Sequence, residues 1–430
     1  MPTAAPAVHA EGMVAAVPLI DLDRPPPAPA ETTAVVRSRP ALLLTVLVTA
    51  LLALGGSVAV TPGLTPVLAV ADPVSSAELG AGSLFLSTPA EVRRYDLPGG
   101  AQRWTRTFDQ AVQNLWVDDA NGMVLVLSGG GDQRLTALDS GSGRPLWADE
   151  SEDTVVITVT GGGVLIQSGV NGEGTLRLVG ARSGRAIWTR AVDPAGFLGP
   201  DELYEGGSPW IVAVGSTGQV VVLSYADGRE LSRGNLGLGS EQAADRTLPA
   251  NSAQVSVVGD RLYLSRRVRG RASLTAYSVS PLKALWRAEG GPIGTVTDCG
   301  PVLCVADTRW VSAIDPAGGA VRWQQPAWGI AYRYDGDRLF AYDNQEDAEA
   351  ALIDAGTGRV LHPLGHSRQL GRLILRTEGV RTWVSVPDPA TGDLRTAGSM
   401  AHVAWFRCQA GGDYLLCPTL TGETAVWRVR

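Results

Sequence analysis

Short apolar and alternating runs, each bounded by residues typical of turns, fill most of the chain. Residues 155–189 show the pattern clearly. Two β-branched or apolar runs separated by three glycines come first, and an alternating segment and a Ser-Gly turn then lead to Trp188. Period-two alternation with Gly punctuation, and no helical period, predicts four short β-strands.

One phrase recurs along the chain, and we call it the turn phrase: an acidic or small residue, a Gly-containing turn, then an apolar residue that is most often Trp. A full copy runs from Leu138 to Trp147. The copies end at Trp104, Trp147, Trp188, Leu231, Trp286, Trp323, Leu361 and Leu394. Their spacing of about 40 residues is typical of propellers and other repeat arrays.

These repeats predict an all-β fold, a β-propeller of four-stranded blades over residues 75–430. A lone four-stranded sheet cannot bury both of its faces, so neighbouring sheets must stack around an axis. Eight blades are favoured, and seven to nine are compatible with the repeats. Residues 61–74 form either a linker or a closing strand, because a strand near Val67–Val70 would complete the last sheet and close the ring.

Composition narrows the class of protein. The 430 residues include 52 Gly and 12 Trp, which favours an all-β array over an α/β enzyme. The formal net charge of −7 argues against nucleic acid as a partner, since phosphate binding relies on clustered Lys and Arg.

Residues 41–60 carry no charge and predict a transmembrane helix preceding the propeller. As a helix they would span about 30 Å, the thickness of a bilayer core. Arg24, Arg37 and Arg39 lie upstream, and the next basic residue downstream is Arg93. The positive-inside rule therefore predicts a single-pass protein of the cytoplasmic membrane, with its N-terminus inside and the propeller outside.

A cleaved signal peptide is the alternative for the same segment, with candidate cleavage sites after Ala59 or Ala71. The long region before the apolar run favours the uncleaved anchor. Residues 1–40 are rich in Ala and Pro and predict a disordered cytoplasmic tail.

The four cysteines form two close pairs, Cys299 with Cys304 and Cys408 with Cys417. Each pair straddles a Gly-containing turn between apolar strands, so each can close a disulfide across its hairpin. Two such disulfides suit an oxidising compartment. Zinc held by the two pairs is the less favoured alternative.

The sequence resembles pyrroloquinoline-quinone-type propeller repeats over about residues 75–430. The segments 137–147 and 313–323 match the Ala-x-Asp-x-x-(Thr/Ser)-Gly-x-x-x-Trp repeat of that family, and 353–361 matches with Leu361 in place of Trp. The family includes quinoprotein dehydrogenases and non-catalytic scaffolds such as the propeller lipoprotein of outer-membrane assembly. The overall layout also resembles membrane-anchored propeller proteins of actinobacteria. The dehydrogenases carry adjacent cysteines beside the quinone, and this chain has none adjacent.

Few residues indicate chemistry. The close pair His362 and His366 is interrupted by Pro and Gly, which fits a surface turn better than a metal site. We expect no catalytic residue, metal site or resident cofactor, with pyrroloquinoline quinone and calcium as the open alternatives. A basic hairpin is the candidate anion-binding site, with a solvated edge that blocks strand pairing as the simpler interpretation. Its residues are Arg261, Arg266, Arg267, Arg269 and Arg271.

The sequence therefore favours a membrane-anchored, extracytoplasmic propeller that acts as a non-catalytic binding or scaffold module. Its ligand would be a protein or an envelope component, met by loops at one end of the ring. Two alternatives belong to other classes: a quinone-dependent oxidoreductase, and a transmembrane sensor coupled through residues 1–40.

Overall fold

The computed structural model describes residues 63–430, apart from several short segments. The segments outside the description are 73, 98, 131–132, 151–153, 170–173, 193–196, 199–208, 216–217, 239–252, 269–270, 308–309, 344–348 and 389–392. Residues 62–430 form one compact unit. Within the described part, no helix is long and apolar enough to cross a membrane. The predicted span 41–60 and the tail 1–40 lie outside the described residues.

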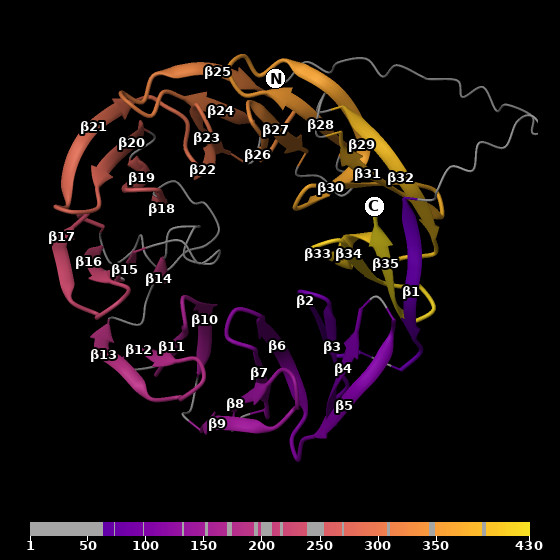
Figure 1. The fold of residues 1–430 in the computed structure, drawn as a ribbon. Coiled ribbons are helices and arrows are strands. Elements are labelled where there is room, and N and C mark those ends of the chain that lie inside the picture. The colour runs from indigo at the N-terminus through magenta and orange to yellow at the C-terminus, as the bar shows by residue number, and fades with distance from the viewer. Residues whose placement is uncertain are drawn as a thin grey trace, which may run out of the picture. The chain divides into compact units, whose positions relative to one another are not determined.

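The described strands form antiparallel four-stranded blades, which follow one another around a ring (Figure 1). The first three blades are β2 (Ser76–Gly80), β3 (Ser83–Ser87), β4 (Glu91–Asp96) and β5 (Ala101–Thr107); β6 (Val112–Asp118), β7 (Met123–Ser128), β8 (Arg134–Asp139) and β9 (Pro145–Asp149); and β10 (Val155–Thr160), β11 (Gly163–Ser168), β12 (Gly174–Gly180) and β13 (Ala186–Val192). In each blade the chain runs from the innermost strand to the outermost one.

Three more blades follow the same order. They are β14 (Phe197–Leu198), β15 (Trp210–Val214), β16 (Gln219–Ser224) and β17 (Glu230–Asn235); β18 (Ala253–Val258), β19 (Arg261–Val268), β20 (Arg271–Ser278) and β21 (Lys283–Glu289); and β22 (Thr295–Cys299), β23 (Val302–Ala306), β24 (Val311–Ile314) and β25 (Val321–Gln325). The middle strands are apolar on both faces because each blade is covered by a neighbour on either side.

One long strand joins the seventh and eighth blades into a seven-stranded sheet. Its strands are β26 (Ile330–Asp335), β27 (Arg338–Tyr342), β28 (Glu349–Asp354), β29 (Val360–Leu370), β30 (Leu373–Glu378), β31 (Arg381–Pro387) and β32 (Leu394–Ala401). The first part of β29 pairs with β28, and its end, from Ser367, pairs with β30. The strand thus closes one blade and opens the next.

The two ends of the described chain share the last blade. It contains β33 (Gln409–Gly411), β34 (Tyr414–Pro418) and β35 (Thr424–Val429), and its outer strand is β1 (Leu64–Val70). A short 3-10 helix, η1 (Trp405–Arg407), precedes this blade. β1 pairs with β35 from Leu64 to Val70 and is the closing strand expected near Val67–Val70.

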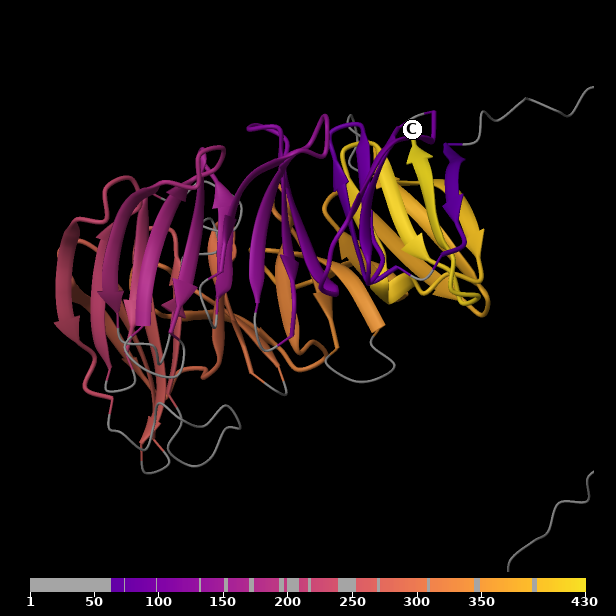
Figure 2. The same ribbon diagram turned by 90° about the horizontal axis from the view of Figure 1, so that it is seen from below.

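Nine clusters of buried apolar side chains lie among the described residues, each between two adjacent blades. Phe85 of the first blade packs with Leu115 of the second, for example. Tyr414 of the last blade packs with Leu84 of the first, so the ring is closed. Seen from the side, the strands run between two faces of the ring (Figure 2).

The fold class is therefore confirmed: the chain is an all-β propeller. The described strands form nine blades, the upper limit of the predicted range and one more than the number favoured from the sequence. Eight turn phrases mark the first eight blades. The last blade has none, because β1 from the opposite end of the chain replaces its phrase-bearing strand.

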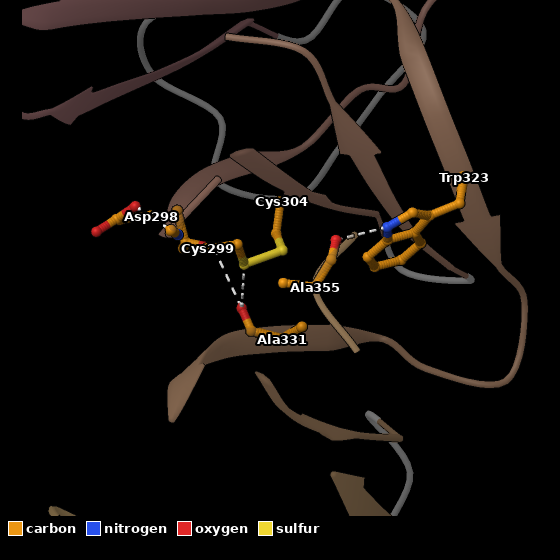
Figure 3. The surroundings of a disulfide bond; sticks show 8 residues. Asp298, Cys299, Cys304, Trp323, Ala331 and Ala355 are labelled. Atoms are coloured by element: carbon orange, nitrogen blue, oxygen red, sulfur yellow. Dashed lines mark hydrogen bonds between the residues drawn. A yellow bond between two sulfur atoms is a disulfide. The ribbon is translucent and has the colours of Figure 1, made fainter. Parts of the chain in front are cut away.

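Both predicted disulfides are confirmed. Cys299 and Cys304 join β22 to β23 with 5.7 Å between their Cα atoms, and Cys408 is bonded to Cys417 at 4.2 Å. All four are buried, so zinc held by free thiols is not the arrangement here. Figure 3 shows that the first disulfide lies against Ala331, within the cluster between the sixth and seventh blades.

Candidate functional site

The ring has two chemically different faces. Because neighbouring strands are antiparallel, successive hairpins alternate between the faces. We call one the phrase face, since it carries the turn phrases between third and fourth strands. We call the other the connector face, since it carries the hairpins between second and third strands and the connections from one blade to the next.

The phrase face is held together by Trp side chains that dock onto the next blade. The Trp ring of one phrase lies on the positive-φ Gly of the following phrase, where a Cβ would come within 3 Å of the ring. These pairs are Trp104 on Gly143, Trp147 on Gly184, Trp188 on Gly228, Trp286 on Gly319 and Trp323 on Gly358. Only Gly leaves room there, so each phrase locks two blades.

The same indoles also donate across the blade boundary. Their Nε1–H groups donate to carbonyl oxygens of Ser140, Ala181, Tyr225, Pro316 and Ala355 at 2.9, 2.6, 2.8, 3.0 and 2.8 Å respectively. The phrase Asp is bound as well: a hydrogen bond from Ser142 and the Arg182 guanidinium lower the pKa of Asp139. The polar groups of these phrases therefore have partners within the ring.

A basic pocket opens on the connector face of the fifth blade, with a volume of about 1090 Å³. Its lining residues are Arg266, Val268, Arg271, Ala272, Ser273, Arg287, Glu289 and Gly290. Arg266, Ser273 and Glu289 lie opposite one another on β19, β20 and β21 and so share one side of the sheet. Leu264 on that side packs against the fourth blade, which places the pocket on the fourth-blade side of the fifth.

Positive charge in the basic pocket is only partly compensated. Arg287 pairs with Glu289 at 2.6 Å. The Nε–H of Arg266 is buried and has no acceptor within the described part of the chain. Among the described residues that line the pocket, three guanidinium groups therefore face one carboxylate. The excess of guanidinium groups among the described lining residues suits a bound anion.

A second cavity, the indole pocket, adjoins the first and has a volume of about 450 Å³. It lies between the fifth and sixth blades and is lined by Gly290, Gly291, Pro292, Trp310, Ser312, Val321, Gln324 and Pro326. Gly290 lines both pockets, so the connection Gly290–Pro292 separates them. No ionisable side chain lines this second cavity among the described residues, and its walls are an indole, two prolines and a half-exposed Val321.

A third cavity, the balanced pocket, lies between the first and second blades, as the indole pocket lies between the fifth and sixth. Its volume is about 560 Å³. Two arginines, Arg106 and Arg134, and two acids, Asp109 and Glu150, line it. Arg134 and Glu150 form an ion pair at 3.5 Å. The charges of the described residues that line this pocket therefore balance, with two arginines and two acids.

The predicted basic hairpin is divided by the structure. Arg266 and Arg271 meet in the basic pocket, whereas Arg267 points to the opposite side of the sheet and is exposed. Arg261 lies at the other end of β19, about 17 Å along the strand from Arg266, where it donates to the Pro316 carbonyl. Arg269 lies outside the described residues.

Two pocket residues, Arg287 and Trp310, were missed from the sequence. Arg287 stands in a turn-phrase strand that looked purely structural, and Trp310 belongs to the next blade. No signal within the hairpin itself could have found either.

A third missed residue is Glu78, halfway along the inner strand β2. Burial raises the pKa of Glu78 to about 7. On the same side of β2, Ser76 donates to Asn114 of the second blade at 3.2 Å, and a Cβ at Gly80 would meet Asp119. Glu78 thus lies at the seam between two inner strands and titrates near neutral pH.

No group of three or more His, Cys, Asp or Glu side chains that could hold a metal ion is present among the described residues. His362 and His366 both lie on the exposed part of β29. Neither disulfide lines any of the three pockets described above.

The chain is similar to several solved structures. BamB from Moraxella catarrhalis is 15% identical, with a TM-score of 0.47, over 85% of this chain and 97% of that one. Sqt1 from Saccharomyces cerevisiae is 11% identical, with a TM-score of 0.47, over 85% and 99%. A quinohemoprotein alcohol dehydrogenase from Comamonas testosteroni is 14% identical, with a TM-score of 0.42, over 86% and 77%. These likenesses carry no argument about function.

The family comparison is more specific. No curated protein matches the chain. A family model described as "Outer membrane protein assembly factor BamB" matches residues 88–324, just over half of the 430 residues. This range begins in the first blade and ends in the sixth, and it includes most of the turn phrases. The chain belongs to the BamB family of propeller repeat proteins.

Proposed function

We propose that this protein is a non-catalytic binding or scaffold module, anchored in the cytoplasmic membrane and displayed outside the cytoplasm, that engages a protein or envelope ligand through its connector face. The observation that carries the proposal is the basic pocket, where three guanidinium groups face one carboxylate. The phrase face supports it by contrast, since its polar groups are used to join blades.

The location rests on the sequence and on the disulfides. The uncharged run 41–60, with arginines upstream, supports a single membrane anchor with the propeller outside. Two buried disulfides support an oxidising compartment. The family description, an assembly factor, fits a module that works by binding other proteins.

Binding of an acidic polymer by the full-length protein in detergent tests the proposal. We expect polyglutamate to bind more tightly than an uncharged polymer, because the pocket carries excess positive charge. The double variant Arg271→Gln/Arg287→Gln should lose roughly 10-fold or more in affinity, since a hydrogen bond to a charged group contributes about 1.5–3 kcal/mol. Polyglutamate binding no tighter than an uncharged polymer would refute the proposal.

Two further assays address the alternatives. A quinone-dependent oxidoreductase would show quinone absorbance, or calcium-dependent dye reduction, in the purified full-length protein. Either result would replace the binding module with an enzyme. Deletion of residues 1–40 addresses the sensor: a cellular phenotype equal to that of complete gene loss would favour it, and an unchanged phenotype would reject it.

A further inference from the structure

We infer that the basic pocket and the indole pocket together bind one extended segment of a partner protein, which carries two acidic residues and, within about five positions, an apolar or aromatic residue. The inference rests on the proposed function and names the chemistry of its ligand. It follows from the position of two unlike cavities on either side of a single short connection.

The charge of the basic pocket sets the first requirement. Arg266, Arg271 and Arg287 together with Glu289 leave an excess of about two positive charges. Arg271 is exposed, and no partner within the described chain takes up its charge. Two carboxylates would neutralise the pocket and accept bidentate hydrogen bonds from planar guanidinium groups.

The indole pocket sets the second requirement. Pro292, Trp310, Val321 and Pro326 give it apolar walls, and no charged residue lines it among those described. Its volume of about 450 Å³ falls within the usual range for small-ligand sites, about 300–1,000 Å³. An apolar or aromatic side chain would bury surface there, at about 25 cal/mol per Å².

The connection between the pockets sets the spacing. Arg287 and Pro292 are five positions apart along the chain, so their Cα atoms lie at most about 17 Å apart. An extended peptide covers about 3.3 Å per residue, which limits the acidic and apolar residues to about five positions apart. A dense polyanion or a lipid headgroup would fill the basic pocket but leave the indole pocket without a matching group.

Fluorescence anisotropy with labelled peptides and the full-length protein in detergent tests this inference. The reference peptide carries two Glu and one Phe at the stated spacing. A second peptide replaces both Glu by Gln, and a third replaces Phe by Ser. We expect each replacement to weaken binding about 10-fold, from the lost charge-assisted hydrogen bonds or the lost aromatic burial.

Protein variants assign each loss to its pocket. Arg271→Gln should weaken the reference peptide about 10-fold and leave the Gln peptide unchanged, because the two changes remove the same contact. Trp310→Ala should likewise weaken binding of the reference peptide and leave binding of the Ser peptide unchanged, because both changes remove the contact of the Phe side chain. Val321→Ser at the exposed rim repeats that test without removing a large side chain. Arg134→Gln in the balanced pocket is the matched control and should have no effect.

Three outcomes would overturn the inference. An equal loss of peptide affinity in Arg271→Gln and Arg134→Gln would show that the peptide does not bind specifically in the basic pocket. Tight binding of the Ser peptide, with polyglutamate still bound, would remove the apolar subsite and leave the proposed function standing. Displacement of the reference peptide by phosphatidylglycerol vesicles, lost in Arg271→Gln, would reassign the pocket to the membrane surface. Failure of polyglutamate itself would instead refute the proposed function.

Discussion

The two faces of the propeller use the same residue types for opposite purposes. On the phrase face, the Nε1–H of Trp323 donates to the Ala355 carbonyl and its ring covers Gly358. On the connector face, the buried Nε1–H of Trp310 has no acceptor within the described chain. Two arginines give a similar contrast: Arg182 pairs with the phrase residue Asp139, whereas the Nε–H of Arg266 has no acceptor among the described residues. In these examples the indole and guanidinium groups of the first face join neighbouring blades, and those of the second do not.

This division has a physical origin. A closed ring needs every blade fixed to the next, and a docking contact repeated at one face achieves this with few residues per blade. The other face can then carry groups that contribute nothing to folding. The comparison predicts that equivalent substitutions will affect stability on the phrase face and binding on the connector face.

The largest effect should come from Gly319→Ala on the phrase face. Gly319 has a φ of 73°, and a Cβ there would lie 2.4 Å from the Trp286 ring. Left-handed strain and steric overlap together should lower the free energy of unfolding by about 2–4 kcal/mol. Chemical denaturation measures the loss. Gly318→Ala is the control, because no atom lies within 4 Å of its Cβ position; equal losses for the two variants would contradict the docking model.

One substitution made on each face sharpens the comparison. Trp323→Phe removes a 2.8 Å hydrogen bond and leaves the Ala355 carbonyl unpaired, so we expect a loss of about 1–2 kcal/mol of stability. Trp310→Phe removes a donor that has no acceptor and should leave the stability unchanged or slightly higher. Denaturation midpoints of the two variants, measured side by side, would show which substitution lowers stability. A loss at Trp310 as large as that at Trp323 would show that both indoles serve cohesion.

Between the two faces, Glu78 should make stability depend on pH. Its pKa in the folded protein is about 7, above the ordinary value of 4.5, so the folded state retains a proton that the unfolded state has lost. Stability should therefore fall as pH rises from about 4.5 to about 7. Partial exposure limits the loss to about 1 kcal/mol. In Glu78→Gln this fall should disappear from the pH series; an unchanged slope would assign it to other groups.

The residues of the phrase face could be recognised from the sequence, because Trp104, Gly143 and their counterparts recur at a regular spacing and belong to local turns. The ninth blade escaped that pattern, since Leu68 of β1 lies beside Gly100 where a phrase Trp would otherwise stand. Only some residues of the basic pocket and the indole pocket on the connector face could be predicted from the sequence. Arg266 and Arg271 are neighbours on one hairpin, but Arg287 joins them through strand pairing and Trp310 through the adjacent blade. Strand alternation alone places Arg266 and Arg267 on opposite sides of the sheet.

The smallest effect should come from Glu289→Gln in the basic pocket. Both partners of the Arg287–Glu289 pair are more than half exposed, so the pair contributes at most about 1 kcal/mol to stability and its loss should be barely detectable in denaturation. Removing this carboxylate raises the charge of the pocket, so the affinity for polyglutamate should rise about 2- to 3-fold, and more at low salt than at high salt. Glu150→Gln makes the same change in the balanced pocket, where Arg134 would then lack its partner. An equal rise in polyglutamate affinity for Glu150→Gln and Glu289→Gln would mean that net charge governs binding and that the basic pocket has no special role. A rise for Glu289→Gln alone would mean that the arrangement of Arg266, Arg271 and Arg287 recognises the anion.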